Sequence, residues 1–160
     1  MRILVDYRPA LRARSGVGEW VHQLSRAMLA AGSATTRLAT RLELVLFSAS
    51  WKDRVAPEVA AELDGATIVD RAIPARLLRR AWNRLGWPPV DWLVPGPLDV
   101  VLSPSPLCVP TARALGVITV HDLDFLDHPE RTYGEMRTDF PRLVRAHAAR
   151  ADLVIAVSRH

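Results

Sequence analysis

A histidine and an aspartate behind a short apolar run are the residues of this chain best placed to do chemistry. The run Val117–Val120 has no alternating polar residue and is too short for a helix, which predicts a strand buried on both faces. His121 and Asp122 follow it directly. In an open parallel α/β sheet, ligands bind outside the carboxyl ends of the strands, so this titratable pair can meet a substrate. We expect His121 to contact the substrate, and Asp122 either to orient the imidazole or to cap the loop.

Two glycines, Gly16 and Gly18, with Val17 between them, precede an apolar helical pattern that starts at Trp20. Glycines at a helix amino terminus let the backbone approach a ligand, and the free N–H groups favour an anion. A plain entry from loop to helix fits the pair equally well, because G-x-G alone is a weak signal. The dinucleotide fingerprint is not met, since Val21 occupies the position of its third glycine and the preceding loop is too long.

Acids and histidines are dense after the predicted strand, as they are in metal sites. The residues concerned are His121, Asp122, Asp124, Asp127, His128 and Glu130. Their spacing matches no EF-hand loop, and two histidines seven residues apart in a loop share no face. We therefore expect no metal site. Further along, His147 is expected to be a packing or surface histidine and not a ligand.

Six apolar segments predict strands, and helical patterns lie between them. The predicted strands are residues 3–5, 42–47, 66–69, 99–102, 116–120 and 152–157. Alternating strands and helices require right-handed crossovers and a parallel sheet with helices on both faces. We predict an α/β protein, with a three-layer, Rossmann-like, doubly wound parallel sheet formed by one domain over residues 1–160.

Several helix boundaries carry cap signals. Gly32 is expected to end the first long helix in a left-handed conformation. Ser50 and Asp53 have the spacing of a capping box for a helix that Pro57 bends or restarts. A second capping box is predicted over residues 132–135.

Residues 76–85 predict an amphipathic helix. Its expected apolar face carries Leu77, Leu78, Ala81, Trp82 and Leu85, and its basic face carries Arg76, Arg79, Arg80 and Arg84. Such a helix can cover the sheet and leave its arginines solvated, which is the commoner use of this pattern. It can also dock on anionic lipid, which would place the protein peripherally on the inner membrane face.

The carboxyl ends of parallel strands meet at one edge of a sheet, so residues far apart in sequence are expected to converge there. The predicted strand ends bring together Arg8, Gly16, Gly18, Ser103, Ser105, His121, Asp122 and Ser158. This convergence predicts a binding site at that edge.

Composition narrows the class of protein. The chain has 160 residues, 49% of them hydrophobic, and a formal net charge of +4, with Lys52 as its single lysine. Basic character favours anionic ligands, without choosing among sugar phosphates, lipid head groups and nucleic acid. The lone Cys108 excludes an internal disulfide and a cysteine-based zinc site. Because the sequence shows neither a signal peptide nor a membrane span, we expect a cytoplasmic protein.

Four motifs in order resemble the amino-terminal domain of family-4 retaining glycosyltransferases, and the likeness spans the whole chain. They are Asp-x-Arg-Pro from Asp6, Gly-Val-Gly-Glu-Trp-Val from Gly16, Val-His-Asp-Leu around His121 with His-Pro after it, and Arg-Ala-Asp-Leu-Val-Ile-Ala-Val-Ser ending at Ser158. The family has the GT-B architecture, in which two Rossmann-like domains face each other across a cleft. The resemblance implies that this chain is the first of those domains.

The resemblance also implies roles for individual residues. A nucleotide-sugar donor serves as co-substrate, held mainly by the second domain, and neither a metal nor a cofactor is implied. Gly16 and Gly18 would lie against the donor diphosphate and the acceptor. His121 matches the family histidine that contacts the transferred sugar and helps to polarise the reacting centre. Arg8 would meet an acceptor phosphate or be solvated.

No stretch matches the paired-glutamate motif of the donor-binding domain. We therefore expect sugar transfer to require such a domain, in cis or in a second chain, and the chain alone to be inactive. The partners expected are this domain and a sugar or lipid-linked acceptor, with no nucleic acid. The alternative is a non-catalytic module or subunit that binds a phosphorylated or lipid-linked ligand. A phospho-receiver is disfavoured, because only Asp6 is present of the acids expected at the first strand and the lysine expected at the fifth strand is missing.

Overall fold

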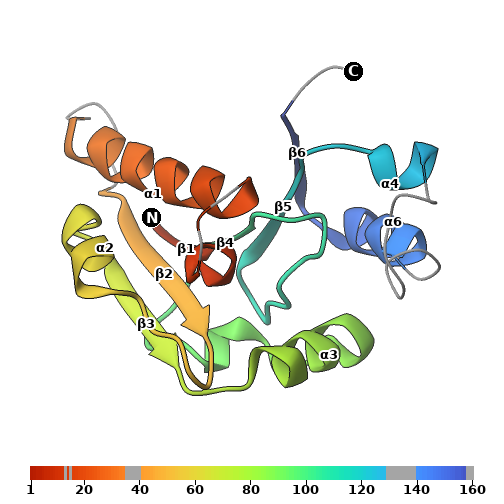
Figure 1. Cartoon of the computed structure of the whole chain (residues 1–160), viewed down its shortest axis with the longest axis horizontal. Coiled ribbons are helices and arrows are strands. Elements are labelled where there is room, and N and C mark those ends of the chain that lie inside the picture. Colours follow the sequence, from red (N-terminus) through yellow and green to blue (C-terminus); the bar gives the residue numbers. More distant parts are fainter. Residues whose placement is uncertain (13, 15, 35–40, 129–139, 158–160) are drawn as a thin grey trace.

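Six strands form one all-parallel sheet in the order β3-β2-β1-β4-β5-β6 (Figure 1). The computed structural model describes residues 1–12, 14, 16–34, 41–128 and 140–157. The strands are β1 (Arg2–Asp6), β2 (Glu43–Ala49), β3 (Thr67–Arg71), β4 (Val100–Ser103), β5 (Leu115–Val120) and β6 (Leu153–Ala156). This order confirms the predicted Rossmann-like, doubly wound fold.

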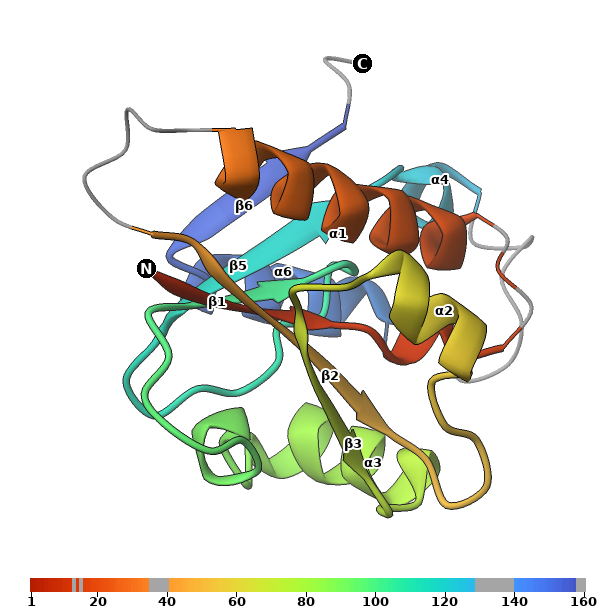
Figure 2. The same cartoon turned by 90° about the vertical axis from the view of Figure 1, so that its left-hand side faces the viewer.

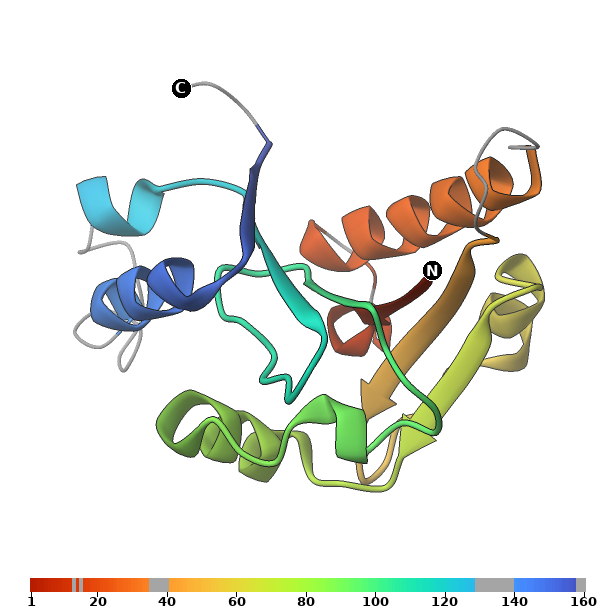
Figure 3. The ribbon, with the colours of Figure 1, turned by 180° about the vertical axis from the view of Figure 1, so that it is seen from behind.

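Helices cover both faces of the sheet (Figures 1 and 2). The long helix α1 (Val17–Ala34) and the short α2 (Pro57–Glu62) follow β1 and β2, whereas α3 (Ala75–Leu85) and α6 (Phe140–Arg150) follow β3 and precede β6. Figure 3 shows α1 and α6 on opposite sides of β5 and β6. The remaining helical turns are η1 (Arg8–Ala10), η2 (Val90–Trp92) and α4 (Asp124–Asp127). In contrast to the predicted alternation, residues 104–114 join β4 to β5 without a helix.

Alternate residues of the central strands supply two separate cores. Leu4 and Phe47 pack with Trp82 of α3 on one face, whereas Val5 packs with Val21 of α1 on the other. All five side chains are buried. Burial on both faces explains why the strands read as continuous apolar runs without polar alternation.

Gly32 does not end α1, which runs on to Ala34. Its φ is not positive, unlike that of Gly86, which ends α3 with φ 60° in the left-handed region. A Cβ at Gly32 would lie 3.3 Å from Cβ of Leu42. Gly32 therefore makes room for the residue that enters β2, a tertiary requirement with the same sequence signature as a cap.

The Ser50–Asp53 pair makes one of the two hydrogen bonds of a capping box but does not begin a helix, because the N–H of Ser50 donates to Arg71 in the neighbouring strand. Oγ of Ser50 accepts from the N–H of Asp53 at 3.0 Å and donates to its carboxylate at 3.0 Å. The helix begins at Pro57, whose fixed φ suits a first helical position. The capping box predicted over 132–135 lies outside the described residues.

The predicted apolar face of α3 is only partly buried. Leu78 and Trp82 pack into the core, but Leu77 is 62% and Leu85 74% exposed. Leu78 and Trp82 lie one helical turn apart on the side of α3 that faces the sheet. Leu77 and Leu85 lie outside this buried stripe, so they are exposed to solvent beside the arginines. Within the described part of the chain, no helix is long and apolar enough to cross a bilayer.

The edge strand β6 is exposed along its whole length. Leu153 is 56%, Val154 44% and Ile155 36% exposed, and in the described part of the chain the strand pairs only with β5. Successive residues of a strand point to opposite faces, so apolar side chains are uncovered on both sides of this edge.

Candidate functional site

The strand order reverses between β1 and β4, and a pocket of about 310 Å³ opens near the carboxyl ends of these strands. Such a switch point is where open α/β sheets bind ligands. Three segments line the pocket: the end of β1 with η1, the inner side of α3, and the loop between β4 and β5. The side chains used below are Asp6, Arg8, Arg76, Arg79, Trp82, Asn83 and Ser105.

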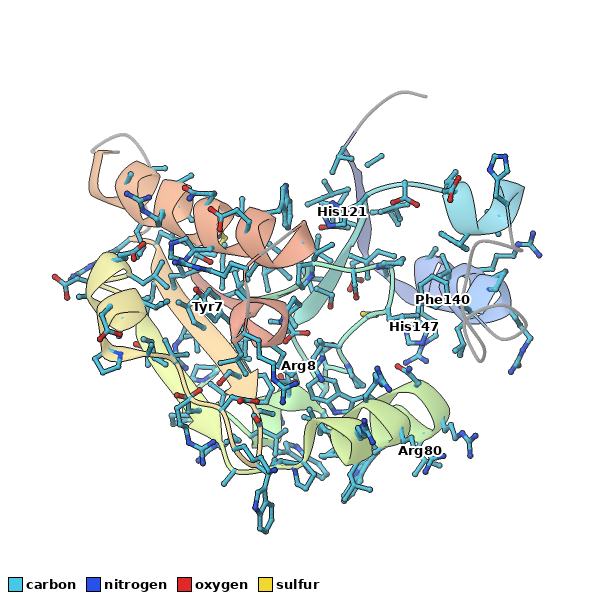
Figure 4. The ribbon with its side chains drawn as sticks, in the orientation of Figure 1. Tyr7, Arg8, Arg80, His121, Phe140 and His147 are labelled. Carbon is cyan, nitrogen blue, oxygen red and sulfur yellow. The ribbon has the colours of Figure 1, made fainter. Side chains whose placement is uncertain are left out.

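Arg8 is held rigidly at the pocket wall. Its Nε and one terminal nitrogen each donate to an oxygen of Asp6 at 2.7 Å, and its guanidinium lies 4.3 Å from the ring centre of Trp82. Figure 4 shows this side chain reaching from η1 toward α3. Bidentate pairing and stacking fix the planar group, which still has N–H donors to offer. The predicted solvated alternative for Arg8 is therefore not what the structure shows.

Other polar groups of the pocket are less constrained. Arg76 and Arg79 are exposed, and neither guanidinium has a hydrogen-bonding or ion-pairing partner among the described residues. Asn83 is half-buried at the same wall. The Oγ of Ser105 closes a small turn with Leu107, whose N–H lies 3.4 Å away. The pocket thus presents several hydrogen-bond donors that nothing in the described chain occupies.

His121 lies at the same edge of the sheet but on the side of α1. Its ring meets the ring of Trp20 edge-on, with 4.9 Å between centroids and 88° between planes. Its Nε2 lies 3.1 Å from the carbonyl oxygen of Pro104, so Nε2 carries the proton and donates it. The ring is half-buried, with Nδ1 unpaired among the described residues. Figure 4 shows His121 beyond the carboxyl end of β5, beside the first turn of α1.

Asp122 caps the following turn and does not orient His121. Its side chain is exposed, and one carboxylate oxygen accepts from the N–H of Asp124 at 3.2 Å. Of the two predicted roles, the structure supports the cap. The groups that orient the imidazole are Trp20, which begins the predicted helical pattern, and the Pro104 carbonyl, which carries no sequence signal.

The two glycines have different surroundings. Gly16 has φ +52°, and a Cβ there would meet nothing within 4 Å. A Cβ at Gly18 would lie 2.6 Å from the carbonyl oxygen of Pro9, so Gly18 lets α1 approach η1. Val17 between them is the first residue of α1 and packs against the core of the α1 side. Only Gly16 therefore faces space that a ligand could enter.

The serines predicted for the site also differ. Ser103 is fully buried, and its Oγ accepts from the N–H of Val109 at 2.8 Å, which anchors the loop that lines the pocket. Ser105 lines the pocket itself. Ser158 lies outside the described residues.

A polar network, buried at Tyr7 and His22 and reaching solvent at Glu62, links the loop before α1 to α1 and α2, and no motif in the sequence signals it. The hydroxyl of Tyr7 lies 2.8 Å from Nδ1 of His22, and Nε2 of His22 lies 2.9 Å from Glu62. Arg14 lies 3.9 Å from the same carboxylate oxygen. Burial raises the pKa of Tyr7, and the Arg14 charge partly offsets this. Because Nε2 of His22 donates to the Glu62 carboxylate, its Nδ1 accepts a hydrogen bond from the Tyr7 hydroxyl. Through Arg14, this network ties the loop that precedes α1 to α1 and α2.

His147 is a packing histidine, as predicted. It is 3% exposed, and its Nδ1 accepts from the N–H of Cys108 at 3.0 Å. Burial lowers the pKa of His147, and Arg150 lowers it further. Burial also raises the pKa of the Cys108 thiol, which disfavours its reactive thiolate form.

Within the described residues, no three or more histidine, cysteine, aspartate or glutamate side chains gather closely enough to hold a metal ion. No protein-family model matches this chain, and neither does any curated protein or solved structure.

Proposed function

We propose that this chain is the acceptor-side domain of a retaining glycosyltransferase, which transfers a sugar from a nucleotide-sugar donor to a hydroxyl acceptor. The sequence motifs resemble those of the family-4 enzymes, and the sheet has the strand order of a Rossmann-like domain. The observation that carries the proposal is the position of His121, half-buried at the carboxyl edge of the sheet beside the first turn of α1. A donor-binding domain, in cis or in a second chain, completes the enzyme.

The hydrogen bond to Pro104 determines how His121 can act. Nε2 donates to that carbonyl, so Nδ1 of the neutral ring is the nitrogen left to accept a hydrogen bond from a sugar hydroxyl. Donating this hydrogen bond makes the hydroxyl oxygen more electron-rich, which stabilises positive charge that develops on the neighbouring ring carbon. An interaction that strengthens as this charge develops raises the rate of the chemical step.

Reconstitution with a donor-binding domain tests the proposal. The measured quantity is sugar transfer from a nucleotide-sugar to a hydroxyl acceptor, with His121→Ala compared with wild type. We expect kcat to fall about 100-fold, the usual effect of losing one such interaction. The matched control is His128→Ala, since His128 is a solvent-facing histidine paired with Asp124 on α4. Wild-type turnover of His121→Ala would contradict the proposal.

The second candidate is a non-catalytic module that binds a phosphorylated or lipid-linked ligand. It is favoured by the arginine-lined pocket at the switch point. The two candidates differ in one respect: both predict ligand binding at the carboxyl edge, but only the transferase predicts turnover when a donor-binding domain is supplied.

Peripheral contact with the cytoplasmic face of a membrane is part of the proposal. Leu77 and Leu85 of α3 are exposed beside Arg80 and Arg84, and Trp87 is 56% exposed just after the helix. Apolar and aromatic side chains flanked by arginines suit the interface of an anionic bilayer. This surface of Leu77, Leu85, Trp87, Arg80 and Arg84 is called the α3 outer surface below.

A further inference from the structure

We infer that the pocket between η1 and α3 binds a phosphate monoester carried by the acceptor. The inference rests on the proposed function, because it names the class of acceptor that the domain receives. The four arginines of α3 fall into two groups, which the sequence does not reveal. Arg76 and Arg79 line the pocket, whereas Arg80 and Arg84 do not, so the basic residues of this helix serve two surfaces. Figure 4 shows Arg80 on the part of α3 turned away from Arg8.

The charge of the pocket favours an anion. Three guanidinium groups, those of Arg8, Arg76 and Arg79, line it together with one carboxylate, that of Asp6. Both oxygens of Asp6 are already engaged by Arg8, at 2.7 Å each. Arg76 and Arg79 have no partner in the described part of the chain, so their charges are uncompensated. Like charges converging on one pocket repel one another, and an anion bound there removes the repulsion.

The geometry favours a phosphate over a carboxylate. Guanidinium groups approach the pocket from two elements, η1 and α3, and each offers N–H donors in a planar fork. A terminal phosphate has three charged oxygens to share among such forks, whereas a carboxylate has two. The amide of Asn83 adds a neutral donor at the same wall, whereas the hydroxyl of Ser105 already donates to the carbonyl oxygen of Leu107 at 3.4 Å.

The pocket has room for more than the phosphate itself. Its volume of about 310 Å³ lies at the lower end of the range for small-molecule sites. The ring of Trp82 forms part of its wall, as do Pro9 and Leu107, which together give an apolar surface beside the charges. A compact phosphorylated molecule with a carbon skeleton therefore fits better than a bare ion.

Binding to the full chain tests the inference without requiring turnover. The probes are glycerol 3-phosphate and its uncharged counterpart glycerol, titrated calorimetrically at about 0.15 M salt, where long-range attraction is screened. We expect saturable binding of glycerol 3-phosphate only. Arg79→Gln and Arg76→Gln are each expected to weaken it about tenfold, the worth of one charge-assisted hydrogen bond. Both side chains are exposed, so these variants should fold, and circular dichroism checks this.

The matched controls are Arg80→Gln and Arg84→Gln, which remove the same charge from the same helix outside the pocket. They are expected to change the affinity by less than about twofold. An equal loss in all four variants, equal binding of glycerol, or no saturation by glycerol 3-phosphate would each overturn the inference.

Two further arms distinguish the sources of the phosphate. A nucleoside diphosphate that binds more tightly than glycerol 3-phosphate, with the same loss in Arg79→Gln, would show that the pocket serves the donor and would overturn the acceptor assignment. Vesicles containing phosphatidic acid that bind through Arg76 and Arg79 and compete with glycerol 3-phosphate would support a lipid-borne phosphate monoester. Because no arm depends on His121, loss of phosphate binding and loss of sugar transfer remain separate results.

Discussion

The ring of Trp20 stands edge-on to the ring of His121, with 4.9 Å between their centroids. Trp20 belongs to the first turn of α1, and His121 follows β5, about a hundred residues later in the chain. The contact fixes one side of the imidazole while the Pro104 carbonyl fixes its Nε2. Trp20 is thus a positioning residue: it acts on the candidate site through His121.

The Trp20 contact can be tested in the enzyme reconstituted with a donor-binding domain. We expect Trp20→Ala to lower kcat about tenfold, because an imidazole free to rotate spends less time in the productive orientation. Trp20→Phe, which keeps an aromatic edge for the ring, should restore most of the rate. A general loss of packing would lower the thermal midpoint of both variants alike and would leave kcat of the folded fraction unchanged, contrary to this prediction.

Gly16 and Gly18 should respond differently to alanine. Gly18→Ala places a Cβ 2.6 Å from a backbone oxygen of Pro9, so η1 or α1 must shift, at a cost of about 2 kcal/mol in unfolding free energy. Gly16→Ala meets no atom within 4 Å and costs only the strain of a left-handed conformation, about 1 kcal/mol. Urea unfolding of the two variants measures the difference. A larger loss at Gly16 would contradict the packing role of Gly18.

Stability is expected to depend on the protonation of His147. Burial lowers its pKa below the ordinary value of 6.5, so the unfolded chain takes up a proton here before the folded chain does. The unfolding free energy should therefore be fully present above about pH 6.5 and fall as the pH drops through the folded pKa. Urea unfolding at a series of pH values between 8 and 5 measures this fall in the unfolding free energy.

The control for this pH dependence is His147→Gln. Its amide oxygen can accept from the N–H of Cys108 but does not titrate in this range. The slope of stability against pH below about 6.5 should be shallower in this variant than in wild type. Identical slopes would mean that other groups cause the acid sensitivity.

The α3 outer surface should bind anionic vesicles. We expect Leu77→Ser together with Leu85→Ser to lower the partition coefficient about tenfold, because both leucines are largely exposed and free to insert. Raising the salt concentration should weaken binding, since Arg80 and Arg84 attract the lipid head groups electrostatically. Leu123→Ser serves as control, because Leu123 is also exposed but lies near β5. Vesicle binding that is undetectable, or equal in all variants, would leave α3 as a helix that only covers the sheet.

The architecture could be predicted because its signals are local. The central residues of β1, β2 and β5 are largely apolar, since both faces of these strands are covered by helices or loops. Once such strands alternate with helical patterns, handedness and sheet geometry leave few topologies, and the observed order is among them. The position of His121 at the edge of the sheet follows from the same reasoning.

Other features depend on tertiary contacts that have no local signal. Gly32 has the spacing of a cap, but the approach of Leu42 is what requires it. The four arginines of α3 look alike in sequence, and only the rotation of the helix against the sheet separates Arg76 and Arg79 from the others. Ser103 is at a predicted strand end, yet the loop that folds back over it makes it an internal anchor.

The exposed edge strand β6 is expected to make this protein prone to self-association. Within the residues that the structure describes, the outer edge of β6 pairs with no strand, and Leu153, Val154 and Ile155 are exposed, so this edge offers a template for a strand from another molecule. Self-association by pairing of β6 edges should increase with protein concentration. It would distort the results of the phosphate-binding and vesicle-binding experiments. Working in dilute solution keeps intermolecular strand pairing low, and light scattering checks that the protein remains monomeric.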